Sequence, residues 1–404
     1  MPATAPYDDR SDADVFSDGR WGLGMQPGAG EPESVWSAWS RSIDHVSVGV
    51  VMALFAIGVV LSFAASPTLA EHNRLDEPFY YAWRHLWFGA PAFLAMFLLS
   101  FLGPKGVRRF GALLAIAGLA ALVGVLFYGV DHGKGAQRWF SVGGLSIQPS
   151  EFAKPGLVIA CAWMLSAMAA TDAAVRAAGA IASFATLALG LALLIAQPDY
   201  GQAALLLAIW GAMFFVAGAP LLLLLALGLA GLGIGWVAYS VEPHVAARID
   251  AFLDPGAHAG RQLQVAEQAI VNGGWGGRGL GEGVAKATLP DAHADFIIAV
   301  AAEEYGFALA ATVVALFATL TLRALWRLRN EPDAFPRLAG LGLAFLIGTQ
   351  ALINLAVAVQ LAPAKGMTLP FISYGGSSMI ASGVAMGLLL ALTRSEGRAS
   401  PEPD

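Results

Sequence analysis

The segment LPDAHADFIIAVAAEEYG (289–306) places acidic side chains at the edge of an apolar stretch and inside it. Ionisable groups in such a stretch are costly to bury and mark functional sites by default. Asp295 stands where the polar part meets the apolar part, so it could cap a helix or act as a general base. One residue can fill both roles. We therefore take Asp295 as the candidate catalytic residue, with His293 as a candidate substrate ligand.

For other polar side chains deep in apolar stretches, hydrogen bonding between helices is a possible explanation. At about 100° of rotation per helical residue, Glu303 falls about 80° from Asp295, whereas Glu304 points to the opposite face. Only Glu303 could share a cavity with Asp295, and for both acids hydrogen bonding to neighbouring helices is the alternative. Gln350 and Asn354 share one helix face, and interhelical hydrogen bonds account for them.

Segment 131–152 and the helix after it supply candidate cations. Lys154 lies in the first turn of an apolar helix, where the helix dipole disfavours a positive charge, so it must find an anion. Glu151 at i−3 is one candidate. The other is a phosphate-bearing ligand at the membrane surface, which Arg138 could bind through its fork and Lys154 as a point charge. Arg138, Lys154 and Glu151 are therefore candidate substrate-binding residues.

A third polar run, KGMTLPFISYGGSS (365–378), precedes the last apolar stretch. Its paired glycines allow the backbone to approach a ligand, and helix N-termini bind anions readily. The alternative is a tight re-entrant turn with capping serines. Non-helical backbone at this depth is tolerated only against protein or a watery cavity, so both readings imply a cavity. Lys365, Ser377 and Ser378 join the candidate substrate ligands.

Together these residues suit transfer from a sugar pyrophosphate. A glycosidase usually needs two carboxylates. Transfer from a good leaving group needs one base and positive groups where charge develops. No cofactor is assigned, although Asp295 beside a pyrophosphate could hold Mg²⁺ or Mn²⁺ through oxygen ligands. The motifs GxxxxGK[ST], HExxH and GxSxG are absent from the sequence, which argues against ATP-driven pumping.

The elements that must position these residues are membrane helices. Of the 404 residues, 57% are hydrophobic and 13% charged, against about 25% charged in soluble proteins. The apolar residues form blocks long enough to span a bilayer. The sequence therefore predicts an all-α, polytopic membrane protein. The expected spans are 46–64, 86–102, 110–130, 153–170, 177–196, 202–217, 220–240, 296–322, 338–360 and 379–393.

The polar segments divide the chain into three parts. We expect a mostly disordered tail over 1–44, with a short interfacial helix near 34–42, a ten-helix domain over 45–393 and a second tail over 394–404. The longest outer loop is expected at 241–294. The net charge of −6 arises entirely in the tails, because 45–393 holds eighteen acids and eighteen bases. With no basic patch, nucleic acid is excluded as a partner.

The distribution of Lys and Arg predicts the orientation. If the N-terminus is cytoplasmic, the short inner loops hold eight bases and three acids. Positive charge in short loops marks the cytoplasmic side. We therefore expect both tails in the cytoplasm and the candidate site on the outer face.

Four segments in this order resemble the SEDS family (shape, elongation, division and sporulation) over essentially all of 45–393. They are RW (138–139), QPSEFAK (148–154), LPDAHADF (289–296) and PFISYGGSS (370–378). The run KGMTLPFI is most similar to division-type members. Ala294, where many relatives have Thr, and Ser146, at a position often basic, depart from the family pattern.

This resemblance implies a glycosyltransferase that polymerises lipid II at the outer face of the cytoplasmic (inner) membrane, at the division septum. Asp295 matches the family's essential aspartate, which implies a base for the GlcNAc 4-hydroxyl. The donor would be a glycan strand on undecaprenyl pyrophosphate. Arg138 and Lys154 match charged positions of the family's outer cavity. The implied partners are a class B penicillin-binding transpeptidase and other division-complex membrane proteins.

Three rival functions stay open. A lipid II flippase would use the same cavity but needs polar access from both sides. An elongation-type polymerase would differ only in its cellular role. A scaffold that recruits a partner would leave Asp295, Arg138 and Lys154 without a purpose.

Overall fold

The computed structural model describes residues 34–72, 74–131, 137–143, 145–253, 261–279, 281–284, 289, 295–363 and 366–394. The chain forms two compact units, residues 1–41 and 42–404. Residues 35–41 of the first unit belong to helix α1 (Val35–Ser42), in which the Trp36 and Trp39 rings stack 5.0 Å apart. The expected short helix is therefore present.

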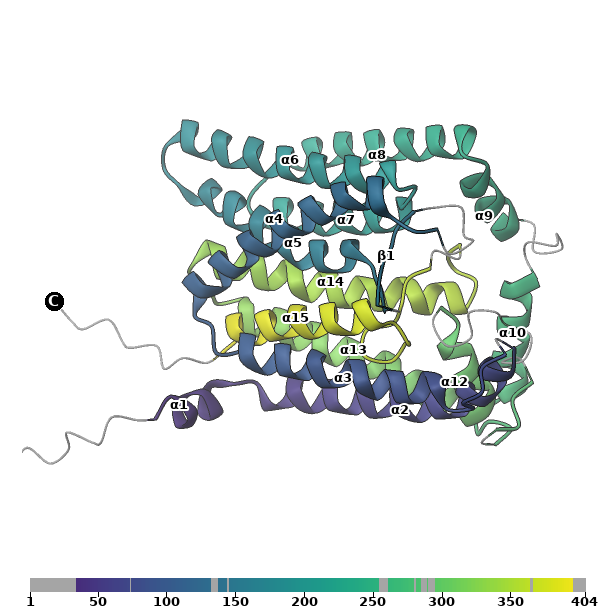
Figure 1. Ribbon diagram of the computed structural model, residues 1–404. Helices are drawn as coiled ribbons and strands as arrows, with labels where there is room; N and C mark the ends of the chain where they lie inside the picture. The colour runs from purple at the N-terminus through teal and green to yellow at the C-terminus, as the bar shows by residue number, and fades with distance from the viewer. Residues whose placement is uncertain are drawn as a thin grey trace, which may run out of the picture. The chain divides into compact units, whose positions relative to one another are not determined.

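Nine of the ten expected spans each coincide with one helix in the described part of the second unit, and the eighth coincides with two (Figure 1). Within it, seven helices contain stretches long and apolar enough to cross a membrane, namely α2, α4, α5, α6, α8, α13 and α14. The helices are α2 (His45–His72), α3 (Tyr80–Leu99), α4 (Pro104–Tyr128), α5 (Pro149–Ser166), α6 (Ala173–Ala196), α7 (Tyr200–Val216), α8 (Leu221–Val241), α13 (Phe307–Leu328), α14 (Ala334–Ala358) and α15 (Gly376–Leu392).

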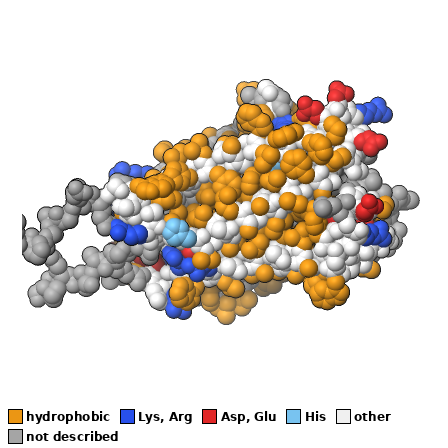
Figure 2. Space-filling model, turned by 90° about the horizontal axis from the view of Figure 1, so that it is seen from below, with side chains coloured by type: hydrophobic (Ala, Val, Ile, Leu, Met, Phe, Trp, Pro, Cys, Tyr) orange, Lys and Arg blue, Asp and Glu red, His pale blue; other side chains and the backbone are white. Residues whose placement is uncertain are grey.

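Helices α5, α14 and α15 form the centre of the bundle. Helix α5 packs against α4, α6 and α14, and α15 packs against α3 and α14. Close packing of α15 on α3 depends on Gly383, where an added β-carbon would lie 2.2 Å from the Ala92 carbonyl oxygen. Helix α8, by contrast, buries only Ala238. Figure 2 shows a broad apolar band, with charged side chains gathered at its two ends.

The eighth expected span, 296–322, is wrong as a single helix. The chain forms α12 (Ile297–Tyr305) and α13, with a break at Gly306. Gly306 has φ of 82°, a conformation that residues with a side chain rarely adopt. An added β-carbon there would lie 2.2 Å from the Trp275 carbonyl oxygen. The break is therefore set by a contact between distant segments.

The segments expected to form outer loops are more structured than expected. The expected loop 241–294 contains α9 (Pro243–Leu253) and α10 (Arg261–Gly273), and α10 packs against α12. These helices are short, so a search for membrane-length apolar blocks does not find them. Segment 131–152 contains an antiparallel hairpin, β1 (Phe140–Val142) with β2 (Leu145–Ile147), in which Ser141 pairs with Ser146. A 3₁₀ turn (Ala167–Ala169) follows α5.

Candidate active site

Asp295 lies just before α12 and faces the segment that leads toward α15. A β-carbon built on Gly366 would lie 3.8 Å from Asp295 Oδ2. The cap position of α12 is Phe296, the residue after Asp295. Asp295 is half-buried. Its carboxylate is therefore placed for contact with a ligand near the 366–369 segment.

Asn354 joins Asp295 to that segment. Its Nδ2 donates to the Asp295 carbonyl at 3.2 Å and to the Met367 carbonyl at 2.6 Å. One helical turn earlier on α14, Gln350 Nε2 donates to the Thr368 carbonyl at 3.1 Å. The two amides, which pattern alone explains as helix packing, hold the backbone beside the candidate base.

Lys154 is the centre of a buried polar cluster. Its Nζ donates to Glu151 Oε1 at 2.9 Å, to Gln202 Oε1 at 2.9 Å and to Gln350 Oε1 at 3.2 Å. Gln202 Nε2 also donates to Glu151 Oε1. The expected pairing with Glu151 is therefore present. With 2% of its surface exposed, Lys154 connects α5, α7 and α14 and, through Gln350, the 366–369 segment.

The two serines of α15 bind different neighbours. Ser377 Oγ accepts from the Gln148 N–H at 2.9 Å and donates to the Ser146 carbonyl at 3.3 Å, so it ties the β-hairpin to the start of α15. Ser378 Oγ shares a hydrogen bond with Thr368 Oγ1. In the turn between Thr368 and Ser378, the buried residue Phe371 has a φ of 64°. Such backbone strain is typical of functional turns.

Arg138 is fixed at the turn between α6 and α7. Its Nε donates to the Gln197 carbonyl at 3.0 Å, its Nη2 donates to the Pro198 carbonyl, and its Nη1 lies 3.9 Å from Asp199 Oδ1. Asp199 is 4% exposed, and its Oδ2 has no hydrogen-bond partner. Burial raises the pKa of Asp199, while the charges of Arg138 and Lys154 act in the opposite direction.

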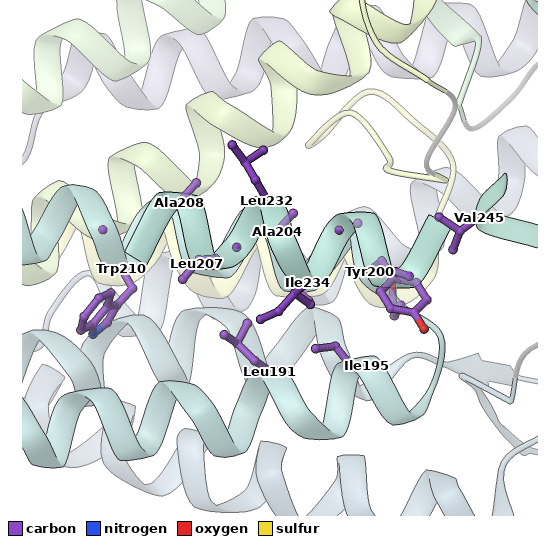
Figure 3. Close-up of a pocket in the computed structure, with 18 of the residues that line it drawn as sticks. Leu191, Ile195, Tyr200, Ala204, Leu207, Ala208, Trp210, Leu232, Ile234 and Val245 are labelled. Atoms are coloured by element: carbon purple, nitrogen blue, oxygen red, sulfur yellow. The ribbon is translucent and has the colours of Figure 1, made fainter. Parts of the chain in front are cut away.

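An apolar groove of about 640 Å³ runs from this turn between α7 and α8. Arg138, Asp199 and Tyr200 line its polar end, and mainly aliphatic side chains of α6, α7, α8 and α9, with Trp210, line the rest. Figure 3 shows Leu191, Ile195 and Ile234 in the apolar part. A long apolar ligand with an anionic head group suits this arrangement of charge and surface.

The other acidic candidate, Glu303, is a structural residue in this arrangement. Its Oε1 accepts from the Val284 N–H at 3.0 Å and lies 3.6 Å from Arg278 Nη1. Glu303 and Glu304 are each 1% exposed. His293 and Lys365 lie outside the described residues. Within the described ranges, no group of three His, Cys, Asp or Glu side chains could hold a metal.

Comparisons with known proteins place the chain in a family. The family model described as "Cell cycle protein", for FtsW, RodA and SpoVE, matches residues 44–398. The chain belongs to the FtsW, RodA and SpoVE family. It is 40% identical over 359 residues to the probable peptidoglycan glycosyltransferase FtsW of Caulobacter vibrioides, covering 88% of this chain and 90% of that protein. It is also 37% identical over 375 residues to the probable peptidoglycan glycosyltransferase FtsW of Alkalilimnicola ehrlichii, covering 91% of this chain and 92% of that protein.

Solved structures of this family share the fold. A chain from "Structural coordination of polymerization and crosslinking by a peptidoglycan synthase complex" matches with a TM-score of 0.72 and 30% identity, covering 87% of this chain and 97% of that one. The rod shape determining protein RodA of Thermus thermophilus matches with a TM-score of 0.64 and 28% identity, covering 87% and 96%.

Several site residues of this family member were missed from the sequence. Gln197, Asp199 and Gln202 form a polar run, QPDYGQ (197–202), between two apolar spans. That interruption was the available signal. Their importance depends on neighbours more than forty residues away, Arg138 and Lys154, so spacing along the chain does not show it.

Proposed function

We propose that this protein is a peptidoglycan glycosyltransferase that polymerises lipid II into glycan strands and releases undecaprenyl pyrophosphate. The observation that carries the proposal is the placement of one carboxylate, Asp295, beside a backbone segment held by the Lys154 cluster. The names of the relatives support the same reaction. A single base and fixed cations suit transfer from a pyrophosphate leaving group.

In the proposed reaction, Asp295 accepts the proton of the GlcNAc 4-hydroxyl of the incoming lipid II. The new bond joins that oxygen to the anomeric carbon of the donor strand, with inversion. The bond from this carbon to the pyrophosphate oxygen breaks, and the electron pair leaves with undecaprenyl pyrophosphate. A divalent cation would add positive charge at the pyrophosphate. Asn354 and Gln350 keep the backbone beside Asp295 in position.

The groove between α7 and α8 suits a polyprenyl chain, with the pyrophosphate at Arg138. Burial raises the pKa of Asp199 beside Arg138, while the charges of Arg138 and Lys154 lower it. Both cations have oxygen partners, but the Arg138 side chain lines the groove and is 12% exposed, whereas the Lys154 side chain is 3% exposed and does not line it. We therefore assign direct phosphate contact to Arg138 and a positioning role to Lys154. Glu151, Ser377 and Ser378 position the same segments, while His293 and Lys365 stay candidate ligands.

We also propose the division role, on the run KGMTLPFI (365–372) and the FtsW names of the relatives, with the site on the outer membrane face at the septum. A class B penicillin-binding transpeptidase is the proposed partner, and the solved peptidoglycan synthase complex supports an assembly of this kind. Other membrane proteins of the division complex are further proposed partners.

The flippase alternative is less well supported. It requires the bundle to open at the end opposite Asp295. There, Asp44 at the start of α2 binds Arg323 Nε on α13 at 2.7 and 2.8 Å, and Arg327 binds both Asp44 and the Thr393 carbonyl after α15. These contacts join the ends of three helices on that side.

The first prediction is that Asp295→Asn abolishes polymer formation from labelled lipid II. The amide keeps the shape of the side chain but cannot accept the proton, and loss of a general base costs about 10²–10⁴-fold in rate. The assay uses the full chain with and without its transpeptidase partner. Asp76→Asn, at an exposed position, is the control. Equal polymer from wild type and Asp295→Asn would refute Asp295 as the base, and no polymer from wild type with its partner would refute the transferase.

A further inference from the structure

At the start of α3, Arg84 is held by aromatic side chains. Its guanidinium carbon lies 5.3 Å from the centre of the Tyr80 ring and 5.4 Å from that of the Phe88 ring. Its Nη1 donates to the Tyr80 hydroxyl. Residues four positions apart lie on the same side of a helix, so the two rings contact the guanidinium from the preceding and the following turn. These contacts fix the side chain in place.

The charge of Arg84 has no acidic partner in the described part of the chain. The ion pairs found there involve Arg138, Lys154, Arg278, Arg323 and Arg327. Asp76 and Glu77, which precede α3, are exposed. A guanidinium cannot lose its proton in a protein. Water or an anionic ligand must therefore balance this charge.

Arg84 lies at the level of lipid head groups. It is in the first turns of α3, next to Trp83 and close to Trp87, whose side chains are 55% and 78% exposed. Exposed tryptophans at a helix end mark the boundary between membrane and water. Lipid phosphates lie at this boundary. An anion that reaches Arg84 from the membrane is therefore most simply a phosphate.

On its other side, Arg84 faces the turn before α15. The Tyr81 and Tyr374 rings are 5.2 Å apart, and a β-carbon on Gly376 would lie 2.6 Å from the Phe88 ring. Burial raises the pKa of Tyr374 to about 12, with Arg84 acting in the opposite direction, which places the guanidinium close to this tyrosine. The turn continues the segment that passes Asp295. Arg84 therefore lies where the lipid boundary meets that segment.

We propose that Arg84 binds the phosphate group of an anionic membrane lipid between α3 and the 374–376 turn. The fork of a fixed guanidinium matches two phosphate oxygens, which a point charge does not. Two lipids carry this chemistry, an anionic phospholipid and a polyprenyl pyrophosphate. The site is separate from Arg138, which binds the turn after α6. It does not depend on the proposed reaction.

The test is lipid binding by the purified, delipidated full chain, measured by native mass spectrometry. Phosphatidylglycerol, undecaprenyl pyrophosphate and phosphatidylcholine are titrated separately. The variant is Arg84→Gln, and the control is Arg74→Gln, which removes an exposed charge from the connection leading to α3. Arg84→Lys keeps the charge without the fork and serves as the variant if Arg84→Gln does not fold.

We expect one tight site for an anionic lipid in wild type and in Arg74→Gln. Arg84→Gln should weaken it about tenfold, which corresponds to ~1.4 kcal/mol, and Arg84→Lys severalfold. The lipid whose binding falls identifies the source of the phosphate. Unchanged binding in the folded Arg84 variants, equal loss in Arg74→Gln, or a wild type that binds phosphatidylcholine as tightly would overturn the proposal. Polymerase activity is not used, so failure of the reaction hypothesis leaves this result unaffected.

Discussion

At the scale of single residues, the site depends on a buried positive charge. Removing an ammonium group from water is costly unless its hydrogen bonds are replaced. Lys154 replaces them with oxygens from Glu151, Gln202 and Gln350, which lie on three helices. The same bonds position Gln350, which donates to the Thr368 carbonyl. A substitution at Lys154 should therefore affect both stability and the segment beside Asp295.

We predict that Lys154→Met lowers the free energy of unfolding by about 3–5 kcal/mol, because Glu151 is left as an unpaired buried charge. Thermal unfolding in detergent or nanodiscs measures the change. In the double variant with Glu151→Gln, most of the stability should return, because no buried charge is left. Polymer formation should stay low in both variants, because Gln350 loses its partner. Equal destabilisation by the single and double variants would contradict the pairing.

At the scale of elements, α12 is the helix that presents Asp295, and the segment after α10 holds its far end. The Arg278 N–H donates to the Glu303 carbonyl at 2.9 Å, and the Phe307 N–H donates to the Gly274 carbonyl at 2.8 Å. The Arg278 side chain also lies beside the Glu303 carboxylate. Because α12 is short, a shift at Gly306 would move Asp295 at its other end.

We predict that Gly306→Ala destabilises the protein by at least about 1–3 kcal/mol and reduces polymer formation. Its φ of 82° is unfavourable for alanine, and the new methyl group would lie 2.2 Å from the Trp275 carbonyl oxygen. Gly276→Ala is the control, because a β-carbon there meets no atom within 4 Å. Melting temperature and lipid II polymerisation are measured for both. Wild-type behaviour of Gly306→Ala would show that the break does not position Asp295.

The spans were predictable because each is a local block of apolar residues, and such blocks determine where a chain crosses a bilayer. The break at Gly306 could not be predicted, because it depends on contact with Trp275, thirty-one residues earlier in the chain. Asp295 as the base stays a prediction, and the pairing of Lys154 with Glu151 could be predicted from local spacing. Asp199 could not, since its role comes from Arg138, sixty-one residues before it.

At the scale of the whole bundle, its two ends differ. The end with Asp295 has the groove, the β-hairpin and helices α9 and α10, whereas the other end holds the cluster of Asp44, Arg323 and Arg327. A polymerase needs access from the first end alone. Contacts that keep the second end together are therefore compatible with the proposed reaction and unfavourable for transport across the bundle.

We predict that Asp44→Asn lowers the free energy of unfolding by about 1–3 kcal/mol at pH 7, since Arg323 and Arg327 lose a charged acceptor but are partly exposed and can be hydrated. Burial alone would raise the pKa of Asp44, but hydrogen bonds from Arg323 and Ser47 and the charge of Arg327 lower it below 3.8. A lowered pKa stabilises the folded state at pH values above the pKa of the unfolded state, and this stabilisation is lost as the pH falls through the pKa of the folded state.

The difference in unfolding free energy between wild type and Asp44→Asn should therefore shrink below about pH 4, whereas Asp333→Asn, which changes an exposed acid at the same end, should match wild type throughout. Denaturant unfolding at several pH values measures it, and a difference that does not depend on pH would assign the effect to packing. Polymer formation should persist in Asp44→Asn, because the chemistry lies at the opposite end.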